Sequence, residues 1–239
     1  MIKIPTGVTG LDEMLVGGLP KGRVFLICGG PGTGKTILAL QYISAAIDRG
    51  ESAVYVTLEE PLSFIRENTN SFGWKLREKE LTKQLKLLDF YTVPFGVESL
   101  ELRDREGRDP SASILRDVIN AIKAIKADHV VIDPLTSVVI HEQRSGIKRY
   151  RIGEIFSEMR KLDCTSVFTS EITSLGSEFY MEEFLADGVI QLDKTIHDFN
   201  LIKTLRIVKM RGVNYDEQPR RYMIGERGFM VYNTEPVRV

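Results

Sequence analysis

The stretch "RVFLICGGPGTGKT", residues 23 to 36, constrains the fold of this 239-residue chain more than any other. "RVFLICG" is a continuous apolar run, which is typical of a strand in a sheet covered on both faces. The following "GGPGTGKT" satisfies the spacing G-x-x-x-x-G-K-[ST] at every fixed position. An apolar stripe of helical period then runs from Lys35 to a stop at Gly50. Strand, glycine-rich turn and helix in this order predict an α/β unit with a phosphate site at the turn.

The composition of the turn explains why it suits phosphate. Glycines let successive backbone N–H groups curl around an anion without a side-chain clash, and the helix N-terminus adds its positive dipole. Lys35 can supply a cation to the β- and γ-phosphate oxygens, and the Thr36 hydroxyl can ligate Mg²⁺. A chance match in a glycine-rich turn is the alternative. The predicted phosphate-binding residues are Gly29, Gly30, Pro31, Gly32, Thr33, Gly34, Lys35 and Thr36.

The rest of the chain continues the alternation and then changes character. Further strands are predicted at 52–60, at 129–133 and at 165–171, with helices after Pro61, at 110–127 and at 144–162. Residues 72–90 predict a break, a short charged helix and another strand. The last third predicts four successive strands, which indicates an antiparallel extension. The fold class is therefore α/β, with a mostly parallel central sheet, helices on both faces and antiparallel C-terminal strands. Without a repeat or a Pro- or Gly-rich linker, we expect one domain over 1–239.

Composition bounds the partners and the location. Hydrophobic content is 43%, charged content 27% and net charge −1, so the whole chain offers no electrostatic attraction to nucleic acid or anionic lipid. Cys28 and Cys164 share no metal-ligand spacing and are expected to be buried, reduced thiols. No apolar run approaches ~18 residues, and the N-terminus lacks a signal pattern. These observations predict a cytoplasmic protein without membrane contact.

Three acidic residues follow predicted strands. Asp133 ends the apolar run "HVVID", where it would hold Mg²⁺ through water; an aspartate that caps a strand before Pro134 is the alternative. Glu59 and Glu60 end the strand predicted at 52–60, and a carboxylate there could orient the attacking water. Because neighbours in a strand face opposite ways, only one of them should face a γ-phosphate. The alternative is an acidic helix start before Pro61.

Late in the chain, "IVKMRGVNY" places two cations, Lys209 and Arg211, on one face of a predicted strand. Cations on an edge strand discourage sheet-to-sheet aggregation, which is one explanation for the pair. The other is a role at a phosphate group far from this strand in the sequence.

In this order and spacing, these pieces resemble the RecA-like P-loop ATPases, most closely the KaiC branch. The matching segments are "TGVTGLDEMLVGGLPKGRVFLICGGPGTGKT", "VYVTLEEP", "NSFGWKL", "HVVIDPLTS" and "VKMRG". The resemblance implies a KaiC/RecA-like ATPase domain that binds ATP or ADP with Mg²⁺ and hydrolyses ATP slowly as a regulatory switch. It also implies a homo-oligomer, a hexameric ring by family resemblance.

The resemblance also implies roles for individual residues. Glu59 and Glu60 would be the catalytic glutamates and Asp133 the Walker B acid, and Ser71 would contact the adenine side of the nucleotide. Lys209 and Arg211 would reach the γ-phosphate of the neighbouring subunit.

One departure concerns phosphorylation. Clock KaiC carries an adjacent Ser–Thr phosphoacceptor pair in its second domain, before an aspartate. Alignment on Asp187 places Glu183 and Phe184 there, and neither can accept a phosphate as that pair does. A circadian autokinase is therefore disfavoured.

Two other functions stay open. A single-stranded-DNA-binding accessory to recombination would use the basic, aromatic-containing residues 141–153, although acidic neighbours indicate a charged helix face and residues 172–184 are acidic. A non-hydrolysing ATP-binding scaffold would share the nucleotide site. Residues 94–109 carry many charges and little periodicity, which predicts an exposed loop.

Overall fold

The computed structural model describes residues 1–91, 110–139, 144–171 and 181–236. The loop predicted at 94–109 therefore lies outside the described residues. So do residues 141–143 and 172–180, which belong to the two segments considered for DNA binding.

A nine-stranded sheet forms the centre of the molecule, in the order β11-β10-β9-β8-β3-β7-β6-β4-β5. The pairs among β8, β3, β7, β6, β4 and β5 are parallel, and those among β8, β9, β10 and β11 are antiparallel. The predicted fold class is thereby confirmed. The strands are β3 (Val24–Gly29), β4 (Ala53–Thr57), β5 (Leu85–Asp89), β6 (His129–Asp133), β7 (Thr165–Glu171), β8 (Gly188–His197), β9 (Asn200–Met210), β10 (Arg220–Gly225) and β11 (Gly228–Pro236).

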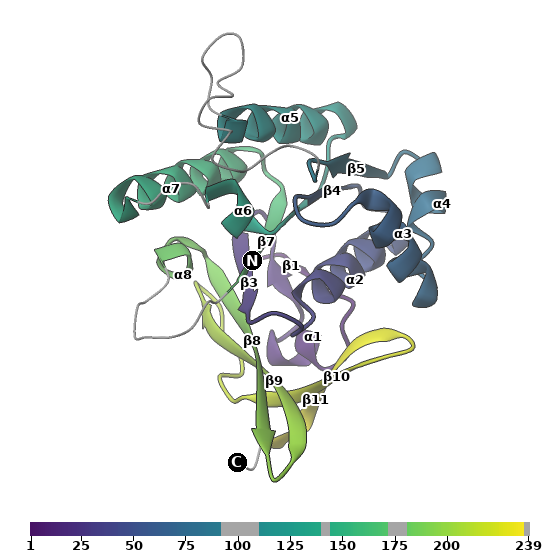
Figure 1. Ribbon diagram of the computed structural model, residues 1–239, viewed down its shortest axis with the longest axis vertical. Helices are drawn as coiled ribbons and strands as arrows, with labels where there is room; N and C mark the ends of the chain where they lie inside the picture. The colour runs from purple at the N-terminus through teal and green to yellow at the C-terminus, as the bar shows by residue number, and fades with distance from the viewer. Residues whose placement is uncertain (92–109, 140–143, 172–180, 237–239) are drawn as a thin grey trace.

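Helices cover both faces of the parallel part of the sheet (Figure 1). They are α1 (Leu11–Met14), α2 (Lys35–Asp48), α3 (Leu62–Ser71), α4 (Leu76–Leu81), α5 (Pro110–Ile125), α6 (Leu135–Val139), α7 (Ser145–Lys161) and α8 (Met181–Leu185). A small sheet of β1 (Lys3–Ile4) and β2 (Leu19–Pro20), together with α1, was not predicted from the sequence.

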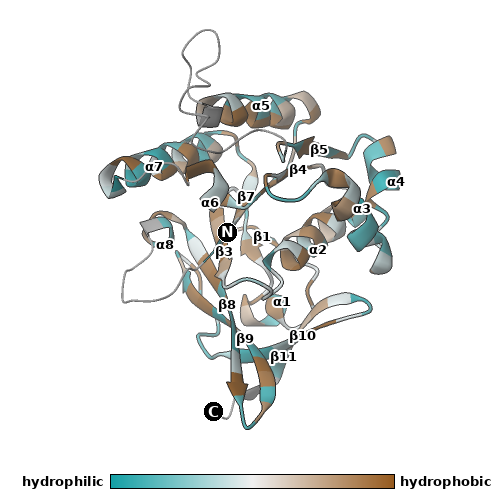
Figure 2. Ribbon diagram, in the orientation of Figure 1, coloured by the Kyte–Doolittle hydropathy of each residue, from teal (hydrophilic) through white to brown (hydrophobic). Residues whose placement is uncertain are grey.

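The alternation of side chains along β3 explains why two cores form. Phe25 and Ile27 point into one buried cluster, whereas Val24, Leu26 and Cys28 point into the other. The first cluster lies against α1 and α2 and the second against α5, α6 and α7. Figure 2 shows the hydrophobic residues gathered along the central strands, whereas α4 is largely hydrophilic. Both cores are continuous apolar layers, as a sheet covered on both faces requires.

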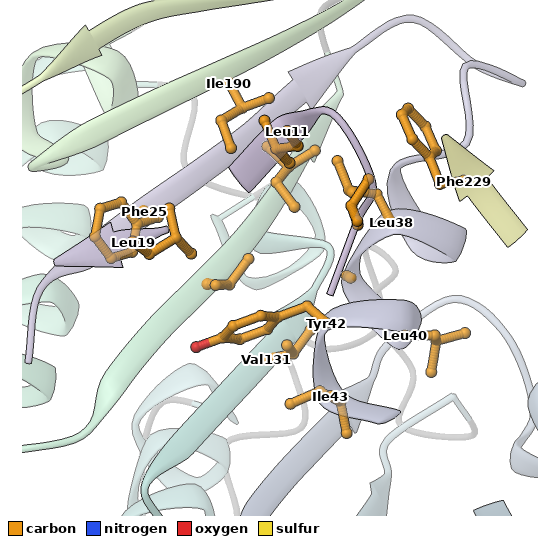
Figure 3. Packing of buried hydrophobic residues seen from close by; sticks show 14 of the residues in the cluster. Leu11, Leu19, Phe25, Leu38, Leu40, Tyr42, Ile43, Val131, Ile190 and Phe229 are labelled. Carbon is orange, nitrogen blue, oxygen red and sulfur yellow. The ribbon is translucent and has the colours of Figure 1, made fainter. Parts of the chain in front are cut away.

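Helix α2 anchors the loop that precedes it. Its side chains Leu38 and Tyr42 pack in one cluster with Val131 of β6 and Ile190 of β8 (Figure 3). Truncation of a fully buried leucine such as Leu38 typically costs about 2–5 kcal/mol. The first turn of α2 is therefore held in place by a well-packed body.

The first strand of the antiparallel extension is longer than the strand that the sequence predicts at 188–193. β8 continues to His197 and β9 begins at Asn200, so the two strands form a long hairpin that projects from the body (Figure 1). β11 then packs back against α1 and α2 through Phe229 and Val231.

Within the described ranges, no helix combines the length and the apolar character that crossing a lipid bilayer requires.

Candidate active site

Four strand ends bring the predicted site residues to one edge of the sheet. Gly29 at the end of β3 pairs with Glu171 at the end of β7, and Thr57 at the end of β4 pairs with Asp133 at the end of β6. β7 lies between β3 and β6 in the sheet. The carboxyl ends of parallel strands are where α/β sheets bind ligands.

The glycine-rich loop connects β3 to α2 and is tightly constrained. The ammonium of Lys35 is buried and donates to the carbonyl oxygens of Gly29, at 3.0 Å, and Gly30, at 3.2 Å. Gly34 has a φ of +97°, and a Cβ at this position would lie 2.5 Å from Ile224 Cδ1. Only glycine satisfies both the backbone conformation and the close approach of β10.

The hairpin formed by β10 and β11 packs against this loop and stabilises it. The buried Tyr222 hydroxyl donates to the Thr33 carbonyl at 2.5 Å. In α2, the Gln41 amide accepts from the Phe229 N–H at 2.6 Å and donates to the Phe229 carbonyl at 3.1 Å. Tyr222 and Phe229 stack with ring centroids 4.3 Å apart. Sequence reasoning missed these contacts, because their partners lie far apart in the chain.

A cavity of about 500 Å³ opens at this edge, and most of the predicted nucleotide-site residues line it. The predicted residues that line the cavity are Pro31, Gly32, Gly34, Lys35, Thr36, Glu59, Glu60, Ser71 and Asp133. Gly29, Gly30 and Thr33 are not among the lining residues and instead form the frame of the loop, where the Thr33 hydroxyl donates to Gly30 O at 2.8 Å.

Asp133 is buried and fixed by two hydroxyl groups. Tyr55 donates to its Oδ2 at 2.7 Å, and the Thr169 hydroxyl donates to its Oδ1. Burial, together with the carboxylate of Asp133, raises the pKa of Tyr55 well above its ordinary value, so Tyr55 remains a hydrogen-bond donor. The carboxylate is thereby oriented toward the cavity that it lines.

The donor set fits Mg²⁺. The Thr36 hydroxyl and the Asp133 carboxylate are hard oxygen donors at the same cavity. The described residues contain no group of three or more His, Cys, Asp and Glu side chains that could hold a metal ion. A sparse protein ligand set is what Mg²⁺ requires when waters and phosphate oxygens complete its shell.

Glu59 and Glu60 both line the cavity, whereas the sequence predicted that only one of them faces a γ-phosphate. The strand predicted at 52–60 ends at Thr57, so the strand alternation on which that expectation rested does not apply at these residues. Glu59 is exposed, and its Oε1 accepts from the Ser137 hydroxyl at 2.6 Å. Glu60 is half-buried, and its pKa is raised by burial, by Asp133 and by Glu59. The two carboxylates therefore have distinct environments.

Residues of α3 and of the segment after it also line the cavity, and they include two aromatic side chains, Phe72 and Trp74. Ser71, the last residue of α3, is another of them, with its hydroxyl donating to Asn68 O at 2.6 Å. Phe72 and Trp74 stack with centroids 4.7 Å apart and an interplanar angle of 23°. The other apolar lining residues of this cavity are Ile37, Leu40 and Ile65. A cavity lined by a glycine-rich loop and by aromatic side chains matches a nucleotide in shape and chemistry.

Lys209 and Arg211 do not line this cavity. The Lys209 ammonium donates to the carbonyls of Glu183 and of Phe184, the latter at 3.2 Å, and Arg211 donates to Phe184 O at 2.8 Å. Arg211 also lies 3.6 Å from the buried Asp187 carboxylate. Burial and the neighbouring Arg211 lower the pKa of Lys209.

The pair lies near the N-terminal ends of the parallel strands, whereas the loop lies at their C-terminal ends. β9 runs antiparallel to β8, so that Met210 pairs with Gly188, which in turn pairs with Phe25 near the start of β3. Gly29 is four residues further along, which is about 13 Å at the rise of a parallel strand. Within one subunit, the two cations and the phosphate loop therefore occupy opposite ends of β3.

The described part of the basic segment forms the start of α7. Lys148 lies 4.0 Å from Glu182 of α8, whereas Arg149 and Tyr150 are exposed. The ion pair is consistent with the charged helix face considered from the sequence.

Comparisons with known proteins agree with this geometry. The family model described as the KaiC ATPase matches residues 4–236. A UPF0273 protein of Thermotoga maritima is 33% identical over 98% of this chain and 98% of its own length. The circadian clock oscillator protein KaiC of Prochlorococcus marinus is 33% identical over 99% of this chain but only 47% of its own length.

A solved structure shows the same fold. The crystal structure of a KaiC-like protein from the hyperthermophilic archaeon Pyrococcus horikoshii aligns with a TM-score of 0.83 and 30% identity. The alignment covers 97% of this chain and 99% of that one. With the family model and the full-length relatives, this establishes that the chain belongs to the KaiC-like ATPases of the RecA superfamily.

Proposed function

We propose that the chain binds ATP with Mg²⁺ and hydrolyses it slowly, as a subunit of a homo-oligomeric regulatory ATPase. The observation that carries this proposal is the convergence of the glycine-rich loop, Glu59, Glu60 and Asp133 on one nucleotide-sized cavity. Membership of an ATPase family supports nucleotide binding.

Different parts of the cavity bind the phosphates and the base of the nucleotide. The loop N–H groups and the N-terminus of α2 bind the phosphates, and Lys35 turns from the Gly29 and Gly30 carbonyls toward the γ-phosphate. The part of the cavity lined by Ser71, Phe72 and Trp74 receives the base.

Glu59 and Glu60 have different roles toward the attacking water. Glu59, oriented by Ser137, positions the attacking water and accepts its proton. The raised pKa of Glu60 suits it to take up or share that proton. When bound, Mg²⁺ would neutralise charge on the phosphate oxygens, with Thr36 and Asp133 as its protein contacts.

Lys209 and Arg211 act on another copy of the chain in this proposal. They lie at the far end of β3 from their own phosphate loop, so a site within the same subunit is out of reach. A second copy that places this edge over the cavity would supply cations to the γ-phosphate as charge develops. Such a head-to-tail contact generates a ring when the rotation closes, which agrees with the hexamer that the family resemblance implies.

The test of the proposal is hydrolysis of Mg²⁺-ATP by wild type and by Glu59→Gln. We expect slow turnover by wild type, and a Glu59→Gln variant that binds ATP but turns over at least about 100-fold more slowly. Tight ATP binding with no turnover in wild type would instead identify a non-hydrolysing scaffold. Absence of ATP binding would refute both functions.

A further inference from the structure

Glu171 is a fourth carboxylate at the cavity, and the proposed mechanism does not use it. It is the last residue of β7, and its register partner is Gly29, the first residue of the phosphate loop. Its side chain is 39% exposed and lines the cavity, and its Oε1 lies 3.9 Å from Lys35 Nζ. Glu171 is therefore the carboxylate that forms an ion pair with the cation of the loop.

The charges around the cavity are unbalanced. Its described lining residues include four carboxylates, Glu59, Glu60, Asp133 and Glu171, but a single cation, Lys35. Lys35 is already bonded to two carbonyl oxygens and paired with Glu171. An anion that needs Lys35 must therefore displace, or share, the Glu171 carboxylate.

A diphosphate and a triphosphate differ in how strongly they depend on Lys35, and therefore in how strongly they compete with Glu171. The N–H groups of the loop hold the β-phosphate, and Lys35 reaches oxygens of both the β- and the γ-phosphate, so only a triphosphate places two phosphate groups on this ammonium. The γ-phosphate brings additional negative charge to the same ammonium that Glu171 contacts. Like charges a few ångströms apart at a half-exposed site repel measurably, and an opposing carboxylate weakens the pull of a shared cation.

We propose that Glu171 sets the discrimination between ATP and ADP, by competing with the γ-phosphate for Lys35. The proposal rests on the nucleotide-binding function proposed above. Glu171 disfavours the triphosphate in a single subunit, so that retention of ATP depends on Mg²⁺ and on cations that a second copy brings. Glu171 is thus a specificity-determining residue of the site rather than a catalytic one.

The test is equilibrium binding of ADP and of the non-hydrolysable analogue AMP-PNP, each with Mg²⁺. Trp74, the only tryptophan of the chain, lines the cavity and provides a fluorescence signal, and calorimetry provides an independent one. We expect Glu171→Gln to bind AMP-PNP about fivefold more tightly than wild type does and ADP within about twofold of wild type. Glu171→Ala should reproduce this shift, because the charge rather than the amide matters, and Glu171→Asp should retain most of the wild-type ratio.

Glu67→Gln is the matched control. Glu67 is an exposed carboxylate on α3 that does not line the cavity, so its removal should leave the ratio of the two affinities unchanged. An unchanged ratio in Glu171→Gln, an equal change for both nucleotides or weaker AMP-PNP binding would overturn the proposed role of Glu171 while leaving nucleotide binding intact. Failure of wild type to bind either nucleotide would instead refute the function on which the proposal rests.

Discussion

The two ends of β3 carry different sets of charged side chains, and the proposed ATPase function requires both sets. At the C-terminal end, a glycine-rich loop, a buried lysine and four carboxylates surround a cavity. At the N-terminal end, Lys209 at the end of β9 and Arg211 just after it donate to carbonyl oxygens of α8. The described lining of the first end has four carboxylates and one cation, whereas the second end has two cations, of which Arg211 lies 3.6 Å from the Asp187 carboxylate. This difference supports the proposal that a second copy of the chain is needed to bring both sets of charges to one site.

The largest effect is expected from Lys35→Ala, which removes the one cation among the described residues that line the cavity. Steady-state hydrolysis of Mg²⁺-ATP should fall by about 10⁴-fold, with weaker ATP binding as well, because both ground-state and transition-state contacts are lost. Lys123→Ala, an exposed lysine on α5, is the control and should behave as wild type does. If Lys35→Ala retained activity, the glycine-rich loop would have no role in hydrolysis, and the account would be contradicted.

Arg211→Ala tests the other end of β3. We expect a fall of about 10³-fold in kcat, since removal of a cation supplied in trans costs that much in other P-loop enzymes. ADP affinity measured on dissociated subunits should not change, because Arg211 lies away from its own cavity. If Arg211→Ala weakens ADP binding by dissociated subunits, the separation of the two ends is contradicted.

Tyr222→Phe sharpens the comparison by testing the contact between β10 and the loop. It removes the bond to Thr33 O and should weaken ATP and ADP binding alike, by about threefold, with kcat at saturation nearly unchanged. Tyr232→Phe removes an exposed hydroxyl from the neighbouring strand β11 and serves as the control. A selective loss of one nucleotide would show that Tyr222 does more than support the loop.

The smallest effect concerns stability. The pKa of Glu60 is higher in the folded chain than its ordinary value, so the folded state binds this proton more tightly than the unfolded state does. Stability therefore falls as pH rises from the ordinary value through the raised one, and the penalty persists at pH 7. Glu60→Gln should raise the Tm at pH 7 by about 1 °C, with the difference from wild type vanishing toward pH 4. A Tm gain that is the same at both pH values would exclude titration of Glu60 as its cause.

Local patterns explain what the sequence could predict. The fold class followed from alternating strands and helices, and the loop from eight consecutive residues, because each element carries its own signal. Asp133 was found because an acid ends an apolar run. The strand predicted at 52–60 ends at Thr57, before Glu59 and Glu60, because the end of a strand near a turn is poorly marked in the sequence.

Contacts between distant residues explain what the sequence could not predict. Tyr222 reaches Thr33 across 189 positions, and no periodicity links them. Glu171 ends a strand as several other acids do, and only the pairing of β7 with β3 shows that it faces Lys35. The carbonyls that hold Lys209 and Arg211 belong to the backbone of α8, which leaves no mark in the side-chain pattern.

The central claim is that the site is completed by a second copy, and mixing two inactive variants tests it directly. Glu59→Gln subunits retain Lys209 and Arg211, whereas Arg211→Ala subunits retain the complete loop and both glutamates. Equal mixing, after the subunits exchange, should restore hydrolysis to about a quarter of the wild-type rate, because one interface in four joins a working cavity to working cations. A mixture that stays as inactive as its components, although sizing shows that the subunits have exchanged, would contradict the account.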